Sequence, residues 1–250
     1  MLHVFLLTKR NTTSKGQAFH IVAHSFGCIL ALELAARHPQ RVRSLILLAP
    51  PYFPSAAAIE GHFIRGNNLF GSGFVFGSAV WLRYPWVAKA VCTAVCQRRH
   101  VWDKLLPAVL RKVVPHAEIV KDYLKHSYYS AQSTFEHCLL RHRLDDTLRR
   151  IVSVHRGKNL PIRIIFGESD RVVPVLHMEQ FLSTLFSDSM LYNYVCERPC
   201  SEKKFCRGRK AKRTAVHSVV CAKGCGHDFP LQHSIWTCNK IHEFLELSPS

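Results

Sequence analysis

The sequence predicts an α/β fold with a mostly parallel sheet and helices on both of its faces. Three observations point to this class: short apolar runs rich in β-branched residues recur along the chain, segments of helical pattern lie between them, and turn residues end most runs. A run that is apolar at nearly every position is typical of a strand buried on both faces, as inner strands of parallel sheets are. The alternation of strand and helix therefore predicts a parallel sheet.

Four runs fit inner strands of such a sheet: residues 19–23, 44–49, 161–166 and 218–222. Residues 1–7 offer at most one further short strand. A helix is expected from Gly27 to the residues before Pro39, because apolar residues recur there at helical spacing and proline ends the run. A second helix-like run ends near Phe186, and a third occupies residues 234–247.

A serine stands at the turn between the first strand and the first helix. The stretch Ala23-His24-Ser25-Phe26-Gly27 differs by one residue from the G-x-S-x-G nucleophile elbow, in which a sharp turn holds a serine hydroxyl exposed at the start of a helix. Alanine replaces the first glycine and is small enough for strand and helix to approach closely. The alternative is an ordinary turn in which Ser25 only caps the helix, and the pentapeptide alone does not decide between the two.

Two further strand ends supply an acid and a histidine. Asp170 follows the strand 161–166, and His227 follows the strand 218–222. Because ligands of parallel sheets bind at the carboxyl ends of the strands, we expect both residues to meet Ser25 at that edge. A serine hydroxyl needs a neutral imidazole to accept its proton and a carboxylate to orient that imidazole. The sequence therefore predicts a catalytic triad of Ser25, Asp170 and His227.

Each of these residues also has a simpler explanation. Asp170 could cap the turn that follows it, and His227 is one of 16 histidines. Glu168 is a second candidate for the acid, although it comes early in its turn. The second strand ends in Ala49-Pro50-Pro51-Tyr52, which leaves no carboxylate at that strand end. The joint order and placement of the three groups favour the triad over the separate explanations.

The order serine, acid, histidine resembles that of the α/β-hydrolase superfamily, and the resemblance runs from Phe19 to the end of the chain. The stretch FHIVAHSFGCILALELAARHPQRVRSLILLAPPYFP is similar to the plant BODYGUARD-like hydrolases of cuticle formation. The similarity continues through AVCTAVCQRRHVWDKLLPAVL, which holds the paired Cys92 and Cys96, and through HSYYSAQSTFEHCLLRH.

This resemblance implies an α/β-hydrolase fold and a serine esterase or lipase that acts on acyl esters in lipid or cuticle metabolism. Ser25 would be the nucleophile, Asp170 the acid and His227 the base. The implied partner is a small-molecule or lipid ester, and no cofactor is expected. Full-length relatives are implied to be extracellular, in the cell wall or associated with a membrane.

The chain departs from a whole hydrolase domain before its nucleophile. Only residues 1–24 precede Ser25, and they contain no His-Gly or Gly-Gly loop that could supply a second oxyanion N–H group. The backbone N–H of Phe26 is then the expected oxyanion donor, and loss of one such donor typically costs about 10²–10³ in turnover. We expect an N-terminally truncated hydrolase with weak or no esterase activity. The alternative is a catalytically inert relative or a non-catalytic binding protein.

We expect one partial hydrolase domain over residues 1–250, with two insertions. Residues 52–150 stand where hydrolases carry a helical lid, and the apolar run 69–82 within them is too short to span a bilayer. Residues 187–214 are crowded with Lys and Arg and hold little apolar surface, so we expect a disordered basic insertion or an artefact of the gene model. The cysteines in and after this segment match no common zinc pattern, so no metal site is expected.

The formal net charge of +17 predicts weak association with anionic surfaces. The basic run lacks interleaved aromatic residues and any recognised reading module, so specific nucleic-acid binding is not expected. The N-terminal apolar run is too short for a secretory signal, and no small-residue cleavage site follows it. The sequence by itself therefore leaves the localisation open.

Overall fold

The computed structural model describes residues 18–55, 144–155, 160–170, 172–186, 192–199 and 217–247, the backbone of residues 3–7 and isolated positions from 57 to 94. Contacts divide the chain into two compact units, residues 55–142 and residues 2–54 with 143–250. In the first unit, the Ser55 carbonyl accepts the N–H groups of Ala58 and Ile59 in a helical turn. The second unit contains the sheet.

The strands of the described residues form one sheet in the order β1-β2-β3-β4-β6-β5. Their bounds are β1 His3–Leu7, β2 Phe19–His24, β3 Val42–Leu48, β4 Ile162–Gly167, β5 Tyr192–Glu197 and β6 His217–Ala222. Every neighbouring pair is parallel except β1 and β2, which are antiparallel. The inner strands are apolar on both faces, and β4 is buried at every position. This confirms the predicted parallel sheet.

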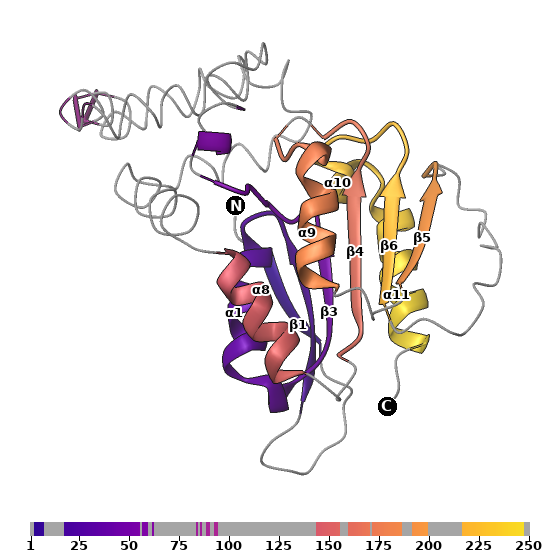
Figure 1. Cartoon of the computed structure of the whole chain (residues 1–250). Coiled ribbons are helices and arrows are strands. Elements are labelled where there is room, and N and C mark those ends of the chain that lie inside the picture. Colours follow the sequence, from indigo (N-terminus) through magenta and orange to yellow (C-terminus); the bar gives the residue numbers. More distant parts are fainter. Residues whose placement is uncertain are drawn as a thin grey trace. The chain divides into compact units, whose positions relative to one another are not determined.

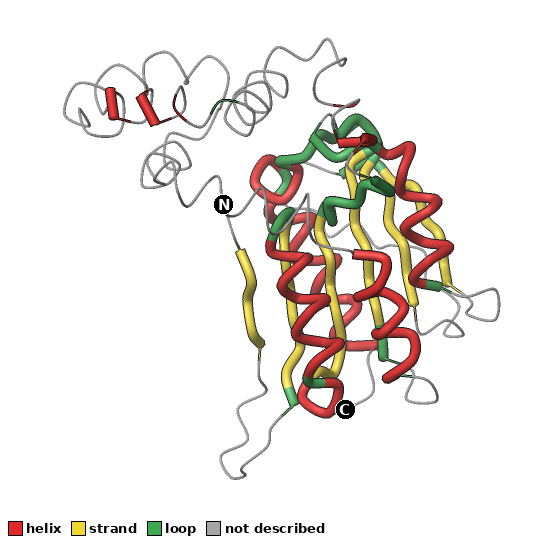
Figure 2. The backbone as a smooth tube through the Cα atoms, turned by 60° about the vertical axis from the view of Figure 1, so that its left-hand side comes forward, coloured by secondary structure: helices red, strands yellow, loops and turns green. Residues whose placement is uncertain are grey.

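Helices cover both faces of the sheet, as Figures 1 and 2 show. On one face lie α1 Gly27–Arg37, α8 Leu144–Val154 and α9 Met178–Leu185, and on the other lie α10 Phe229–Gln232 and α11 Ser234–Leu247. Short 3₁₀ turns follow α1 at Pro39–Arg41 and precede α9 at Val175–His177. Each face has its own buried cluster, so alternate residues of one strand serve different clusters: Ile164 packs with the first group of helices and Ile165 with the second.

Helix α8 was not predicted, because its residues 144–150 were assigned to the lid insertion. Its apolar side chains Leu144, Leu148 and Ile151 recur at helical spacing and are buried in the cluster that contains α1. The boundary at residue 150 was therefore wrong, and residues 52–54 likewise group with the sheet unit. The rest of the expected lid, including the run 69–82, lies almost entirely outside the described residues.

Strand β5 lies within the segment 187–214 that was expected to be disordered, and for residues 192–197 this expectation is wrong. Two tyrosines and a glutamate of this strand contact residues of other elements. The Tyr192 ring stacks on that of Phe186 with centroids 5.1 Å apart, and the Tyr194 ring lies 6.5 Å from that of Phe166. Glu197 forms an ion pair with Lys240 at 2.8 Å. These contacts and the backbone pairing with β6 offset the entropy of ordering the strand. Residues 200–216 lie outside the described part of the chain.

Gly167 at the end of β4 lies against the loop that follows β6. A Cβ atom at this position would stand 2.4 Å from the carbonyl oxygen of Cys225 and 2.6 Å from that of Gly226. We expect Gly167→Ala to lower the free energy of unfolding by about 1–3 kcal/mol, as overpacking typically does, because the loop must move. Urea denaturation measures this change.

Gly226→Ala is the matched control for this substitution. Its Cβ would meet the nearest atom, Oδ1 of Asp228, at 3.4 Å, which is ordinary van der Waals contact. We expect the control to cost less stability than Gly167→Ala. Equal losses in the two variants would contradict the close approach of β4 to the loop.

Candidate functional site

Ser25 occupies a strained turn between β2 and α1. Its φ of 53° lies in the left-handed region, which residues other than glycine seldom adopt. The Ser25 N–H donates to the carbonyl of Leu48 at the end of β3 (2.9 Å), and the Ser25 carbonyl accepts the N–H of Cys28 in the first turn of α1 (2.8 Å). These bonds attach the turn to the neighbouring strand and to the helix. The turn therefore has the geometry of a nucleophile elbow.

Cys28 lies beneath this turn and is fully buried. Its Sγ lies 3.3 Å from the carbonyl oxygen of Ala23 and 3.5 Å from that of Leu48. Burial raises the pKa of the Cys28 thiol well above its ordinary value, so the thiol stays protonated at neutral pH. Cys28 therefore supports the turn as a packing residue and a weak donor.

The structure brings the side chains of Ser25, His227 and Asp170 together. The Nε2 atom of His227 lies 2.8 Å from the Oγ of Ser25, and its Nδ1 atom lies 2.8 Å from the Oδ2 of Asp170. A neutral imidazole with its hydrogen on Nδ1 donates to the carboxylate and leaves Nε2 to accept the bond from the hydroxyl. This is the arrangement that proton transfer from serine to histidine requires.

Asp170 is held in place by the turn that follows β4. Its side chain is only 2% exposed, and its Oδ1 accepts the N–H groups of Val172 (2.8 Å) and Val173 (2.9 Å). One carboxylate oxygen thus caps the turn while the other faces the His227 imidazole. Both interpretations of Asp170 from the sequence, a turn cap and a partner of the histidine, therefore apply at once, because each uses a different carboxylate oxygen.

Glu168, the second candidate acid, faces a different group. Its Oε2 accepts the N–H of Gly224 at 2.8 Å, in the loop between β6 and His227. Two backbone bonds attach the same loop, from Glu168 N–H to the Ala222 carbonyl (3.0 Å) and from Ser169 N–H to the Cys225 carbonyl (2.8 Å). Glu168 therefore holds the loop that carries His227, and Asp170 is the carboxylate that contacts the imidazole.

His24 is a site residue that the sequence reasoning missed. Its Nε2 lies 3.1 Å from the carbonyl oxygen of His227, and the two imidazole rings are 5.1 Å apart with an interplanar angle of 39°. When His24 Nε2 carries a hydrogen, it donates to that carbonyl and so connects the turn at Ser25 to the loop that carries His227. The position of His24 beside the serine was the only signal in the sequence, because its partner lies more than 200 residues later.

Phe26 stands where an oxyanion donor is expected, immediately before α1 and with helical backbone angles. N–H groups at the start of a helix have no partner within the helix and carry partial positive charge, which favours a developing oxyanion. Residues 8–17, upstream of β2, lie outside the described residues.

Two features are absent among the residues that the structure describes. No group of three or more His, Cys, Asp or Glu side chains there could hold a metal ion. None of the helices in the same part of the chain has the length and apolar character needed to cross a bilayer.

The sequence matches the family model of the α/β hydrolase fold over residues 4–199. It is 32% identical over 161 residues to the Arabidopsis thaliana protein "Probable lysophospholipase BODYGUARD 4", covering 63% of this chain and 37% of the relative. To "Probable lysophospholipase BODYGUARD 5" of the same plant it is 28% identical over 184 residues, covering 70% of this chain and 39% of the relative. The chain thus spans less than two fifths of the length of either relative.

The fold is also shared by a solved structure, a mutant of the protein DBJA. That structure is 14% identical, has a TM-score of 0.51 and aligns with 93% of this chain and 69% of its own.

The bond from His24 to the histidine loop predicts a stability difference between two variants. We expect His24→Ala to lower the free energy of unfolding by about 1 kcal/mol, because the His227 carbonyl loses its donor. His24→Gln should lose less, because its amide can still donate to that carbonyl. Urea denaturation compares the two, and equal losses would show that the hydrogen bond does not attach the loop.

Proposed function

Because the chain belongs to the α/β-hydrolase fold family, we propose that it is a serine hydrolase of acyl esters, of the esterase or lipase type. One observation carries the proposal: Ser25, His227 and Asp170 form a continuous chain of hydrogen bonds, each 2.8 Å long, at the carboxyl edge of the sheet. This chain supplies a nucleophile, a base and an orienting carboxylate in the order that acyl transfer uses.

The proposed reaction proceeds through an acyl-enzyme. The Oγ of Ser25 attacks the ester carbonyl carbon while its proton passes to His227 Nε2, and the Phe26 N–H stabilises the oxyanion that forms. His227 then gives this proton to the leaving alcohol as the carbon–oxygen bond breaks. A water molecule repeats the sequence on the acyl-enzyme, which releases the carboxylic acid and restores Ser25. Asp170 stays ionised throughout and stabilises the imidazolium.

The proposed substrates are acyl esters of lipids. Two relatives carry the name probable lysophospholipase, and a lysophospholipid holds an acyl ester of the kind that this site would cleave. A role in lipid or cuticle metabolism belongs to the same proposal. We also propose that residues 55–142, which form a compact unit of their own, are the helical lid insertion.

A fluorophosphonate probe tests the proposal directly, because it reacts covalently with an activated serine. We expect the full chain to be labelled at Ser25, as peptide mapping would locate, and Ser25→Ala to lose the label. Labelling that survives Ser25→Ala would assign the activity to another residue. A folded chain that takes up no label would overturn the proposal and favour the catalytically inert relative.

The two candidate acids can be separated by a matched pair of variants. We expect Asp170→Asn to lower the hydrolysis of a chromogenic acyl ester by up to about 10⁴-fold, because the amide holds the wrong tautomer of His227. Glu168→Gln keeps an oxygen that accepts the Gly224 N–H, so it should cost less than about tenfold. A larger loss in Glu168→Gln than in Asp170→Asn would reverse the assignment of the acid.

A further inference from the structure

Two cysteines that take no part in the triad lie opposite each other on neighbouring strands. Cys196 on β5 and Cys221 on β6 are register partners in the parallel pairing, and both are free thiols. Parallel neighbours lie about 4.8 Å apart, within the Cα separation of about 4.4–6.8 Å that a disulfide needs. The backbone therefore places the two residues at a distance that a disulfide can bridge.

Both side chains also lie on the same face of the sheet. Cys221 belongs to the buried cluster that contains Phe166. The ring of Tyr194 packs at 6.5 Å from the Phe166 ring, and Cys196, two residues along β5, shares the face of Tyr194. Cys225, the other buried cysteine near β6, belongs to the cluster on the opposite face. Cys221 is therefore the partner that the geometry offers to Cys196.

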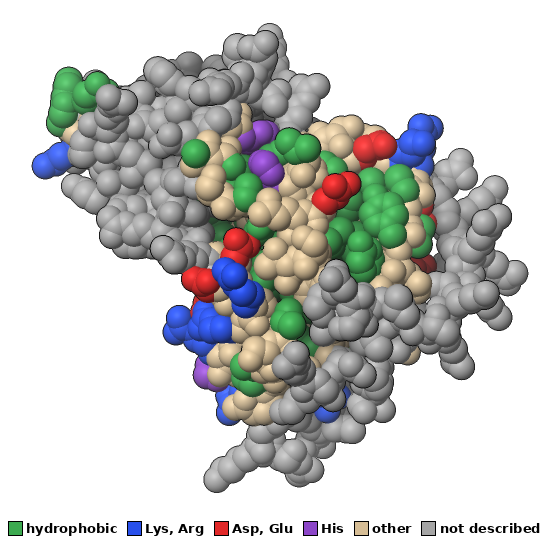
Figure 3. All heavy atoms as spheres, viewed as in Figure 1, with side chains coloured by type: hydrophobic (Ala, Val, Ile, Leu, Met, Phe, Trp, Pro, Cys, Tyr) green, Lys and Arg blue, Asp and Glu red, His purple; other side chains and the backbone are tan. Residues whose placement is uncertain are grey.

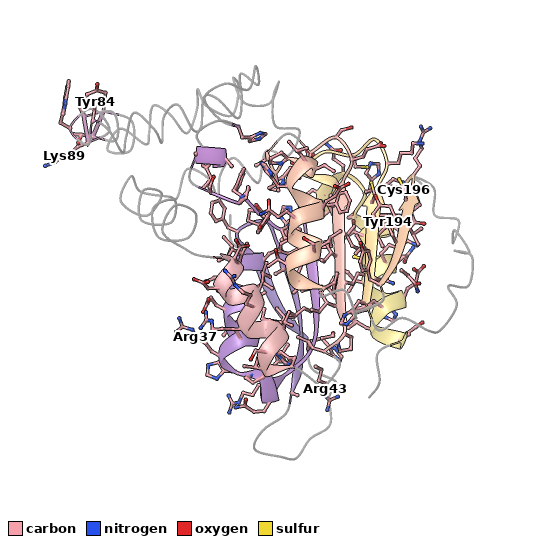
Figure 4. The ribbon with its side chains drawn as sticks, in the orientation of Figure 1. Arg37, Arg43, Tyr84, Lys89, Tyr194 and Cys196 are labelled. Carbon is pink, nitrogen blue, oxygen red and sulfur yellow. The ribbon has the colours of Figure 1, made fainter. Side chains whose placement is uncertain are left out.

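The two thiols differ in their access to solvent. Cys196 is exposed, whereas Cys221 is only 4% exposed. Figure 4 shows Cys196 and Tyr194 at the β5 edge of the sheet, and Figure 3 shows apolar side chains gathered at the surface in this region, where Tyr192, Tyr194 and Val195 are exposed. A small oxidant can therefore reach Cys196 more readily than Cys221.

We propose that Cys196 and Cys221 form a reversible, redox-sensitive disulfide that attaches the edge strand β5 to β6. The oxidant is a low-molecular-weight disulfide such as glutathione disulfide. The Cys196 thiolate attacks one of its sulfurs, its S–S bond breaks and one glutathione thiolate leaves. The Cys221 thiolate then attacks the Cys196 sulfur and the second glutathione leaves. Two protein thiols are oxidised, one disulfide is reduced to two thiols, and the two protons pass to the glutathione thiolates.

The surroundings of Cys221 slow the closure of the disulfide. Burial, helped by the neighbouring Cys196 thiol, raises the pKa of Cys221 to about 11. Only the thiolate attacks a disulfide. Below the pKa of Cys221, its thiolate fraction therefore grows about tenfold for each unit by which the pH rises. The mixed disulfide on Cys196 should therefore persist longer at pH 7 than at pH 9.

The bond would stabilise a strand that has one neighbour in the sheet. Within the described residues β5 pairs only with β6, so its attachment depends on a single ladder and a few side-chain contacts. A disulfide between residues 196 and 221 closes the intervening loop and restrains the unfolded chain. The oxidised protein should therefore unfold at a higher temperature than the reduced protein. This inference does not depend on the proposed catalytic function.

The test uses the full chain and glutathione disulfide. After incubation at pH 8 and alkylation of the remaining thiols, mass spectrometry of the digested protein should find a peptide pair linked through Cys196 and Cys221. The melting temperature should be a few degrees higher than after reduction with dithiothreitol. In Cys221→Ala, Cys196 should keep a glutathione adduct, because no thiol remains to displace it.

Two further variants separate this bond from other thiol chemistry. Cys196→Ser should remove the linked peptide and the melting difference, and it tests the proposal even where the buried Cys221→Ala does not fold. Cys238→Ser changes an exposed cysteine on α11 and should retain both. A bond from Cys196 to Cys200 or Cys206, a glutathione adduct as the only product, or an equal melting difference in Cys196→Ser would overturn the proposal.

Discussion

The site depends on one constraint, the continuation of the hydrogen-bond ladder of the parallel sheet beyond the strand ends. The Ser25 N–H bonds to Leu48, the Ala49 N–H to Ile165 and the Glu168 N–H to Ala222, so each loop begins in register with the next strand. Ser25 and Ala49 have positive φ angles at these positions, and the bonds hold them there. Because these backbone bonds fix the start of each loop relative to its neighbour, the side chains of the triad lie at fixed separations.

The two carboxylates of the loop after β4 have different partners because the backbone bonds fix where each one lies. Asp170 and Glu168 are two residues apart, yet one faces the imidazole and the other accepts a backbone N–H of the next loop. The close approach at Gly167, where no side chain fits, brings that loop near enough for both bonds to form. Orientation of the histidine is therefore shared among a carboxylate, a backbone contact and His24 on the elbow.

The face of the sheet that α11 covers is stabilised by charge as well as by apolar contact. Arg163 of β4 is buried, donates to the Ser218 hydroxyl at 2.7 Å and lies over the Phe244 ring of α11 at 4.9 Å. Burial lowers the pKa of Arg163 to about 10, which still leaves it charged at neutral pH. Lys240 of α11 pairs with Glu197 at 2.8 Å and so connects the edge strand β5 to the helix layer. Buried cations need such partners, because desolvation is costly.

The sequence by itself determined the inner strands and helices α1 and α11, and it predicted the three residues of the candidate triad, because apolar runs, turn residues and a short motif are local signals. It did not determine β5, because the tyrosines of that strand pack against Phe186 and Phe166, which only the fold brings beside them. Nor could it assign His24 to the His227 carbonyl or show that Glu168 accepts the N–H of Gly224. These contacts join residues far apart in the chain, and only the register of the folded sheet decides which of them meet.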